Sequence, residues 1–77
     1  MRFATWNVNS IRTRVDRVIA FLERSSTDVL AMQEIKCRPD QFPTAPFKEA
    51  GYHVAIHGLN QWNGVAVASR FPILDIQ

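Results

Sequence analysis

Residues 2–34 read RFATWNVNSIRTRVDRVIAFLERSSTDVLAMQE, and this stretch decides the fold. Its first seven residues are rich in β-forming types, which predicts a strand over residues 2–8. Residues 29–33 form a short apolar run that stops at Glu34, which predicts a second strand, apolar on both faces as in a strand covered on both sides. The residues between the two strands have helical periodicity. A strand–helix–strand unit makes its two strands parallel, with a right-handed crossover.

The segment between the two strands predicts one amphipathic helix. Its apolar residues recur at helical spacing, with charged residues between them: Ile11, Val15, Val18, Ile19 and Leu22. Such a helix has about three turns. Asn9 or Ser10 is suited to cap its first turn, and the polar run 25–28 ends it.

The remaining residues predict a loop, a short helix and a hairpin. The predicted elements are a proline-rich loop over 35–46, a short helix around 47–50, strands over 52–57 and 64–69 that pair as an antiparallel hairpin, and an extended segment over 71–77. The edges of such a sheet would be unpaired, which is a liability in a finished domain. We therefore expect the rest of the sheet to lie outside these 77 residues.

Composition places the chain among ordinary globular proteins. Apolar and aromatic residues make up 47% and charged residues 21% of the 77 residues, enough for one small domain at most. The formal net charge is +2, and Arg, whose planar fork suits phosphate, supplies most of the cations. Arg12, Arg14 and Arg17 lie close together, although a solvated helix face explains them equally well.

The sequence predicts localisation only through features that it lacks. Cys37 is the single cysteine, so no internal disulfide can form, which fits a reducing compartment. The first residues do not form a secretory signal, and no run approaches the roughly 20 apolar residues needed to span a bilayer. The sequence therefore predicts a cytoplasmic protein without a membrane partner.

Two polar residues follow from the predicted topology as site candidates. Asn7 and Glu34 come at the carboxyl ends of the two parallel strands, which lie about 4.8 Å apart in a sheet. Open α/β sheets bind ligands in the crevice at this edge. One carboxylate, a neighbouring amide and water suit Mg²⁺. The sequence therefore predicts that Glu34 and Asn7 bind a metal and take part in catalysis.

Each candidate also has an interpretation without a function. Glu34 could pair with Lys36 or an arginine, Asn7 could be a turn residue, and Asn9 could act only as a helix cap. His53 and His57 alternate with apolar residues on one strand, which is more typical of structural or exposed histidines than of ligands.

Four segments resemble the exonuclease III/AP endonuclease family, and together they span nearly the whole chain. Trp6–Arg12 (WNVNSIR) is similar to the family motif W-N-V/I-N/D-G-I/L-R, and Asp28–Lys36 (DVLAMQEIK) to D-I/V-L/I-x-L/M-Q-E-T/I-K. Gly51–Val54 and Trp62–Arg70 resemble its third and fourth strands. One departure is Ser10, which stands where the family has Gly. If that position needs a positive φ, Ser strains it.

The resemblance implies roles for individual residues. Glu34 matches the metal-binding glutamate, and Asn7 matches an amide at the floor of the active site. The remaining matched positions are implied to face DNA: Asn9, which also joins the outer shell of the metal, Arg12 at a backbone phosphate, and Trp62 and Asn63 at the minor groove near the lesion. The implied cofactor is Mg²⁺, with Mn²⁺ as an alternative, and the implied substrate is double-stranded DNA with abasic sites or 3′ ends.

The resemblance also implies an incomplete enzyme. The expected fold is a four-layer α/β sandwich like that of DNase I, of which residues 1–77 would be the truncated N-terminal part of one endonuclease/exonuclease/phosphatase domain. The family's tyrosine, Asp-x-Asn pair and Asp–His pair have no match in these residues. We expect the full-length parent to be a monomeric abasic-site endonuclease and 3′–5′ exonuclease, and this chain alone to be inactive. The alternatives are a non-catalytic product with weak nucleic-acid binding, or a related phosphodiesterase that acts on lipid or RNA.

Overall fold

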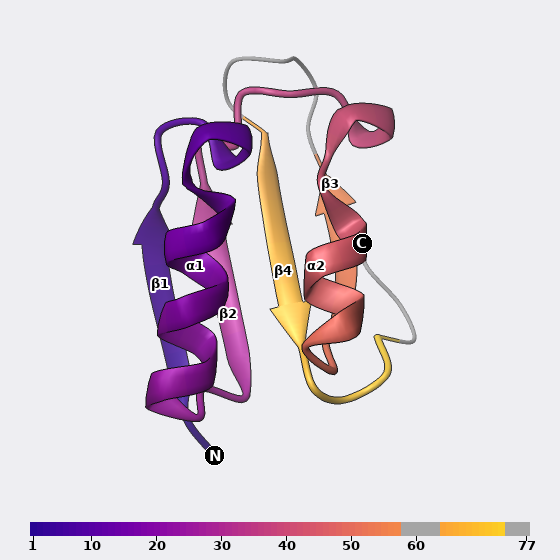
Figure 1. The fold of residues 1–77 in the computed structure, drawn as a ribbon. Coiled ribbons are helices and arrows are strands. Elements are labelled where there is room, and N and C mark those ends of the chain that lie inside the picture. The colour runs from indigo at the N-terminus through magenta and orange to yellow at the C-terminus, as the bar shows by residue number, and fades with distance from the viewer. Residues whose placement is uncertain (58–63, 74–77) are drawn as a thin grey trace.

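The computed structural model describes residues 1–57 and 64–73 of the chain, which form one mixed sheet and two helices (Figure 1). The strand order is β1-β2-β4-β3, with β1 and β2 parallel and the other neighbours antiparallel. The elements are β1 (Phe3–Asn7), α1 (Ile11–Ser25), β2 (Val29–Gln33), the 3-10 turn η1 (Pro39–Gln41), α2 (Thr44–Glu49), β3 (His53–His57) and β4 (Val65–Ser69).

The predicted strand–helix–strand unit is confirmed. Strands β1 and β2 pair in parallel from Phe3 opposite Val29 to Asn7 opposite Gln33. In Figure 1, β1 points up, α1 lies in front of the sheet and β2 lies to the right of β1, so the crossover is right-handed. This register brings the carboxyl ends of both strands to one edge of the sheet.

Both helices cover the same face of the sheet, and the core lies between them and that face (Figure 1). The fully buried side chains of this core include Val18 and Leu22 from α1, Phe47 from α2, and Leu30 and Met32 from β2. Each apolar side chain here leaves water, which is the main driving force for packing the helices on the sheet.

The opposite face of the sheet is the more open one in the described residues. Alternate residues of β2 on that face, Val29 and Ala31, are only half-buried, and Phe3 of β1 is 63% exposed. Within the described residues β2 is covered on one face alone, because α1 and α2 both pack on that face. Cover on both faces stays a prediction for the whole domain.

Helix α1 is longer than predicted, and its first turn is capped differently. Ser10 occupies the N-cap position, as predicted, but its side chain makes no capping hydrogen bond and its backbone has φ 85°. The helix runs for 15 residues and ends where Ser26 adopts the left-handed conformation, with its N–H bonded to the Leu22 carbonyl at 3.1 Å. A left-handed residue after the last turn is a common helix ending.

The loop between β2 and β3 contains more structure than the sequence predicts. Helix α2 begins at Thr44, so Pro46 lies in its first turn and not in the loop. Proline is tolerated there because the N–H groups of the first turn have no partner within the helix. Gly51, with φ 91°, follows the helix and turns the chain into β3.

The predicted hairpin of β3 and β4 is confirmed, with His53 opposite Ser69 and His57 opposite Val65. The predicted turn between these strands and the end of the predicted extended segment lie outside the described residues. In the part of the chain that the structure describes, no helix combines the length and the apolar character that a membrane crossing requires.

Candidate functional site

Two short loops meet at the carboxyl ends of β1 and β2. Backbone hydrogen bonds join them beyond the last residues of the strands: Ser10 N–H donates to the Glu34 carbonyl at 2.9 Å, and Ile11 N–H donates to the Ile35 carbonyl at 3.0 Å. The Ile35 N–H in turn donates to the Gly64 carbonyl at 3.1 Å, just before β4. The loop after β1, the loop after β2 and the residue before β4 are therefore joined by backbone hydrogen bonds.

The pattern of the sequence explains which side chains of these loops stay at the surface. Val8, Ile11 and Ile35 are fully buried, so they hold the loops against the core. The polar residues next to them are left at the rim, with Asn9 exposed and Glu34 half-buried. The buried apolar residues thus fix the backbone of the loops, and the polar side chains between them lie at the surface.

Asn7 and Glu34 lie side by side, as the sequence predicts. The Asn7 amide Nδ2 donates a short hydrogen bond to Glu34 Oε2. The amide oxygen of Asn7, which the sequence analysis proposes as a metal ligand, accepts a hydrogen bond from the Asn9 backbone N–H at 3.2 Å. Both ends of the Asn7 amide are therefore engaged within the site.

Lys36 joins this cluster in a way that the sequence analysis missed. Its ammonium Nζ donates to Asn9 Oδ1 at 2.5 Å, which links the tips of the two loops. The alternative interpretation paired Lys36 with Glu34, but the only ion pair within 4.0 Å among residues 1–57 and 64–73 joins Arg38 to Asp40. The motif carries Lys36 two residues after Glu34, and this spacing was the available signal.

Backbone strain concentrates at the same place. Among the described non-glycine residues, five have a positive φ, and four of them belong to these loops: Asn9 (46°), Ser10 (85°), Glu34 (55°) and Lys36 (53°). Such conformations cost on the order of 1–3 kcal/mol each and persist only where the surroundings enforce them. They are often found at functional sites, and here they include Glu34 itself.

Arg12 extends the polar rim. It is exposed in the first turn of α1, near the chain that leaves β2. Burial raises the pKa of the Cys37 thiol above its usual 9.0, the charge of Arg12 lowers it, and that of Asp40 raises it. Arg12 is therefore close enough to this loop for its charge to act there.

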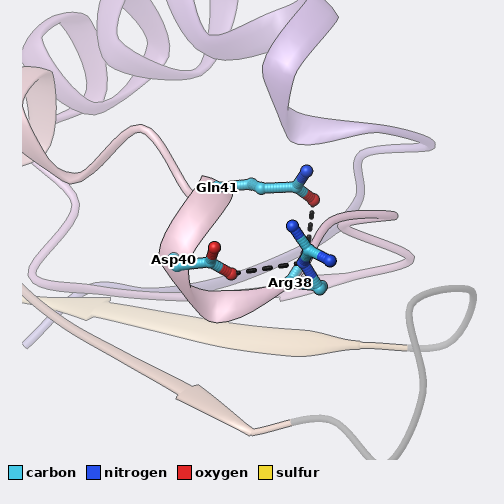
Figure 2. Close-up of polar contacts among 3 residues, drawn as sticks. All are labelled: Arg38, Asp40 and Gln41. Carbon is cyan, nitrogen blue, oxygen red and sulfur yellow. Dashed lines mark hydrogen bonds and ion pairs between the residues drawn. The ribbon is translucent and has the colours of Figure 1, made fainter.

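Arg38, a second cation in the loop after β2, forms an ion pair with Asp40 (Figure 2). Arg38 Nε lies 3.4 Å from Asp40 Oδ1, and its backbone N–H donates to Gln41 Oε1 at 3.1 Å. Both charged side chains are mostly exposed, so water screens the pair and it contributes little to stability. Arg38 precedes η1 and Asp40 lies within it, directly after the site.

Other predicted candidates lie apart from the cluster or outside the described residues. Trp62 and Asn63 fall among the residues that the structure does not describe. His53 and His57 are exposed at the two ends of β3. A cavity of about 360 Å³ beside β3, partly lined by Lys48 and His53, includes none of the predicted site residues.

The donor atoms fit a hard cation held by few protein ligands. In the described part of the chain, no group of three His, Cys, Asp or Glu residues is arranged to hold a metal ion. Glu34 supplies one carboxylate, of which Oε2 is bound to Asn7. Mg²⁺ keeps several water ligands and is often held by one or two carboxylates and substrate phosphate, so these residues fit it as part of a site.

Comparisons with known proteins show what the chain is similar to in sequence. The profile of the Endonuclease/Exonuclease/phosphatase family matches residues 4–77. The chain is 36% identical over 70 residues to exodeoxyribonuclease III of Haemophilus influenzae. The matched residues make up 91% of this chain and 26% of that protein.

Solved structures show the same similarity. An AP endonuclease from Archaeoglobus fulgidus superposes with a TM-score of 0.84 at 48% identity, over 91% of this chain and 28% of the other. The 3′–5′ exonuclease NExo from Neisseria meningitidis superposes with a TM-score of 0.84 at 40% identity, over 91% and 27%. A 3′ phosphatase NExo from Neisseria, equally similar, is bound to a product DNA hairpin. The chain thus spans about a quarter of the length of these relatives, and its fold is that of the DNase I-like AP endonucleases.

Proposed function

Because the chain belongs to the Endonuclease/Exonuclease/phosphatase family, we propose that it forms the part of a DNA nuclease that binds a metal ion and a phosphate. The observation that carries the proposal is the hydrogen bond from the Asn7 amide to the Glu34 carboxylate, at the carboxyl ends of two parallel strands. This edge is where open α/β sheets bind their ligands.

The names of the relatives support DNA as the substrate. The Haemophilus relative is an exodeoxyribonuclease, the Archaeoglobus relative an AP endonuclease, and the Neisseria relative is bound to a DNA hairpin. We propose that the protein to which this segment belongs cleaves double-stranded DNA at abasic sites and removes nucleotides from 3′ ends. Lipid or RNA substrates have no such support.

Glu34 would hold the metal ion, Mg²⁺ or Mn²⁺, through the carboxylate that Asn7 orients. A bound divalent ion would stabilise the charge that develops on the attacking or leaving oxygen of the phosphodiester. The Asn7 amide is locked between Glu34 and the Asn9 backbone, so it keeps the carboxylate in one rotamer before substrate arrives. Pre-positioning of this kind lowers the cost of reaching the reactive geometry.

The remaining predicted residues would serve DNA binding: Arg12 at a backbone phosphate, Asn9 at the outer shell of the metal ion, and Trp62 and Asn63 at the minor groove near the lesion. Arg12 and Asn9 are exposed on the same rim as Glu34, and Trp62 and Asn63 belong to the connection between β3 and β4. Contacts to phosphate are independent of base sequence, which suits an enzyme that must act on lesions in any context.

We also infer that residues 1–77 are the N-terminal part of one such domain and do not turn over alone. The chain spans 26–28% of its relatives, and its site supplies one carboxylate. Removing members of a catalytic unit typically costs orders of magnitude in rate.

A nicking assay and a segment exchange test these two parts separately. The 77-residue chain, with Mg²⁺ and abasic duplex DNA, should show no robust nicking. Robust nicking that disappears in Glu34→Gln would show that the chain is a complete enzyme.

In the segment exchange, this chain replaces the matching 70 residues of the Haemophilus exodeoxyribonuclease III. We expect the exchanged enzyme to nick abasic DNA, and Glu34→Gln to reduce its rate by about 100-fold or more, since changes around a metal ligand already cost 10–100-fold. Glu49→Gln, an exposed glutamate of α2, is the matched control. Equal rates for the two variants, with circular dichroism confirming that both fold, would remove Glu34 from the site.

A further inference from the structure

Lys36 makes a contact that none of the roles above explains. Its ammonium reaches from the loop after β2 to Asn9 Oδ1 in the loop after β1, at 2.5 Å. The side chain is half-buried, and among the described residues it forms no ion pair with a carboxylate. A lysine held in this way beside a metal-binding carboxylate needs a reason, because an unneutralised cation there repels a metal ion.

The hydrogen bonds run in one direction from Lys36 to Glu34. An ammonium has only donors, so the oxygen of the Asn9 amide must face it. The Asn9 backbone N–H is also only a donor, so the oxygen of the Asn7 amide must face that group. The Asn7 NH₂ is then left to donate to the Glu34 carboxylate, as observed. Reversing either amide would put two donors or two acceptors face to face.

The backbone shows why the contact is needed. Asn9 has φ 46° and Lys36 has φ 53°, so both partners of this hydrogen bond lie in a conformation that non-glycine residues seldom adopt. Backbone hydrogen bonds between the two loops hold their bases together. The Lys36–Asn9 contact holds the tips, where the strained residues would otherwise relax.

We propose that Lys36 is a positioning residue for Glu34. It fixes Asn9, Asn9 fixes the Asn7 amide, and Asn7 binds one oxygen of the Glu34 carboxylate, so that Glu34 presents its other oxygen to a divalent cation. This inference rests on the proposed function. The competing role for Lys36 is direct contact with a DNA phosphate.

Whether Lys36→Met strengthens or weakens metal binding distinguishes a positioning role of Lys36 from an effect of its charge alone. Removing a cation near the site should tighten metal binding if Coulomb repulsion is all that Lys36 contributes. If Lys36 positions Glu34, Lys36→Met should weaken binding, by about tenfold, as is typical for groups that orient metal ligands. Mn²⁺ binding to the 77-residue chain, measured by electron paramagnetic resonance, shows the direction of the change.

The control variants keep the result specific. Lys36→Arg preserves a cationic donor and should restore most of the affinity. Lys48→Met changes the only other lysine, exposed on α2, and should have no effect. Tighter or unchanged Mn²⁺ binding in Lys36→Met would overturn the proposal. Unchanged Mn²⁺ binding together with a salt dependence of DNA binding reduced by about one phosphate contact would assign Lys36 to the competing role.

A readout without metal distinguishes failure of this proposal from failure of the proposed function. In nuclear magnetic resonance spectra, hydrogen exchange of the Asn7 side-chain amide should be slow in the wild type, Lys36→Arg and Lys48→Met, and at least about tenfold faster in Lys36→Met. If Glu34→Gln leaves Mn²⁺ binding unchanged, the metal site is wrong. If Asn7 exchange is equal in Lys36→Met and Lys48→Met, the positioning role is wrong.

Discussion

At the scale of single residues, Ser10 stands out because its conformation conflicts with its type. It has φ 85° and ψ 100°, outside the left-handed region that Ser26 occupies with φ 54° and ψ 37°. Ser is expected to be strained at this position if the position needs a positive φ, and the positive φ of Ser10 confirms that condition. A side chain at positive φ costs on the order of 1–2 kcal/mol, a cost that glycine does not carry.

Ser10→Gly should therefore stabilise the chain. We expect the free energy of unfolding to rise by about 1 kcal/mol, because relief of strain exceeds the extra chain entropy that glycine has when unfolded. Urea unfolding measures the change. Ser25→Gly is the control, since Ser25 lies in the last turn of α1 and its hydroxyl donates to the Phe21 carbonyl, so this variant should lose about 1 kcal/mol. A loss of stability in Ser10→Gly would show that the Ser10 side chain, and not the backbone, matters there.

At the scale of elements, α1 connects the core to the rim of the site. Val18 and Leu22 are buried against the sheet, and they fix the helix so that Arg12 lies in its first turn, beside the chain that leaves β2. Arg24 lies at the other end of the same helix. The two arginines therefore have the same chemistry but lie at opposite ends of the sheet.

Arg12→Ala should weaken DNA binding equally for all base sequences. The slope of log affinity against log salt concentration should decrease by about one, as expected for the loss of one phosphate contact. Fluorescence anisotropy with duplex DNA of two unrelated sequences measures both quantities, and Arg24→Ala should change neither. A slope that is the same in Arg12→Ala and the wild type would assign Arg12 to the solvated face of the helix.

The elements themselves were largely predictable from the sequence, because their signals are local. β-forming residue types, a short apolar run and the helical spacing of apolar residues correctly predicted β1, β2 and α1, and the hairpin was also predicted correctly. The start of α2 was missed because Pro46 was taken for a loop residue, although proline fits a first turn. The turn η1 was missed because three residues are too few to show a periodic pattern; its backbone hydrogen bonds run from the Gln41 N–H to the Arg38 carbonyl and from the Phe42 N–H to the Pro39 carbonyl.

Prediction of the site was limited by a different cause. The pairing of Asn7 with Glu34 follows from strand direction alone, so the sequence was sufficient for it. The contact between Lys36 and Asn9 depends on positive φ values at both residues. Neither residue type signals that conformation as glycine would, so the motif spacing that puts Lys36 two residues after Glu34 did not by itself predict this contact.

At the scale of the whole molecule, the sheet has two ends with different roles. The candidate site lies where β1 and β2 end, at the level of the pair Asn7 and Gln33. The opposite end is held by a cluster around Tyr52, which is 4% exposed. Its hydroxyl donates a short hydrogen bond to the Thr27 carbonyl and accepts one from Arg70 Nε at 3.2 Å. The cluster joins the chain before β2, before β3 and after β4.

Tyr52→Phe should destabilise the fold and leave the site intact. Without the hydroxyl, the carbonyl of the buried Thr27 loses its donor, which costs about 1–3 kcal/mol. In a domain of this size the melting temperature should fall by about 4–8 °C for each kcal/mol. Arg70→Ala should have a smaller effect, because the Arg70 side chain is exposed and water can replace it.

Mn²⁺ affinity, measured well below the melting temperature, should be unchanged in both variants, since the lost hydrogen bonds lie at the far end of the strands from Glu34. A change in Mn²⁺ affinity in Tyr52→Phe, with an unchanged melting temperature, would mean that the two ends of the sheet are coupled and that the site depends on more than its own two loops.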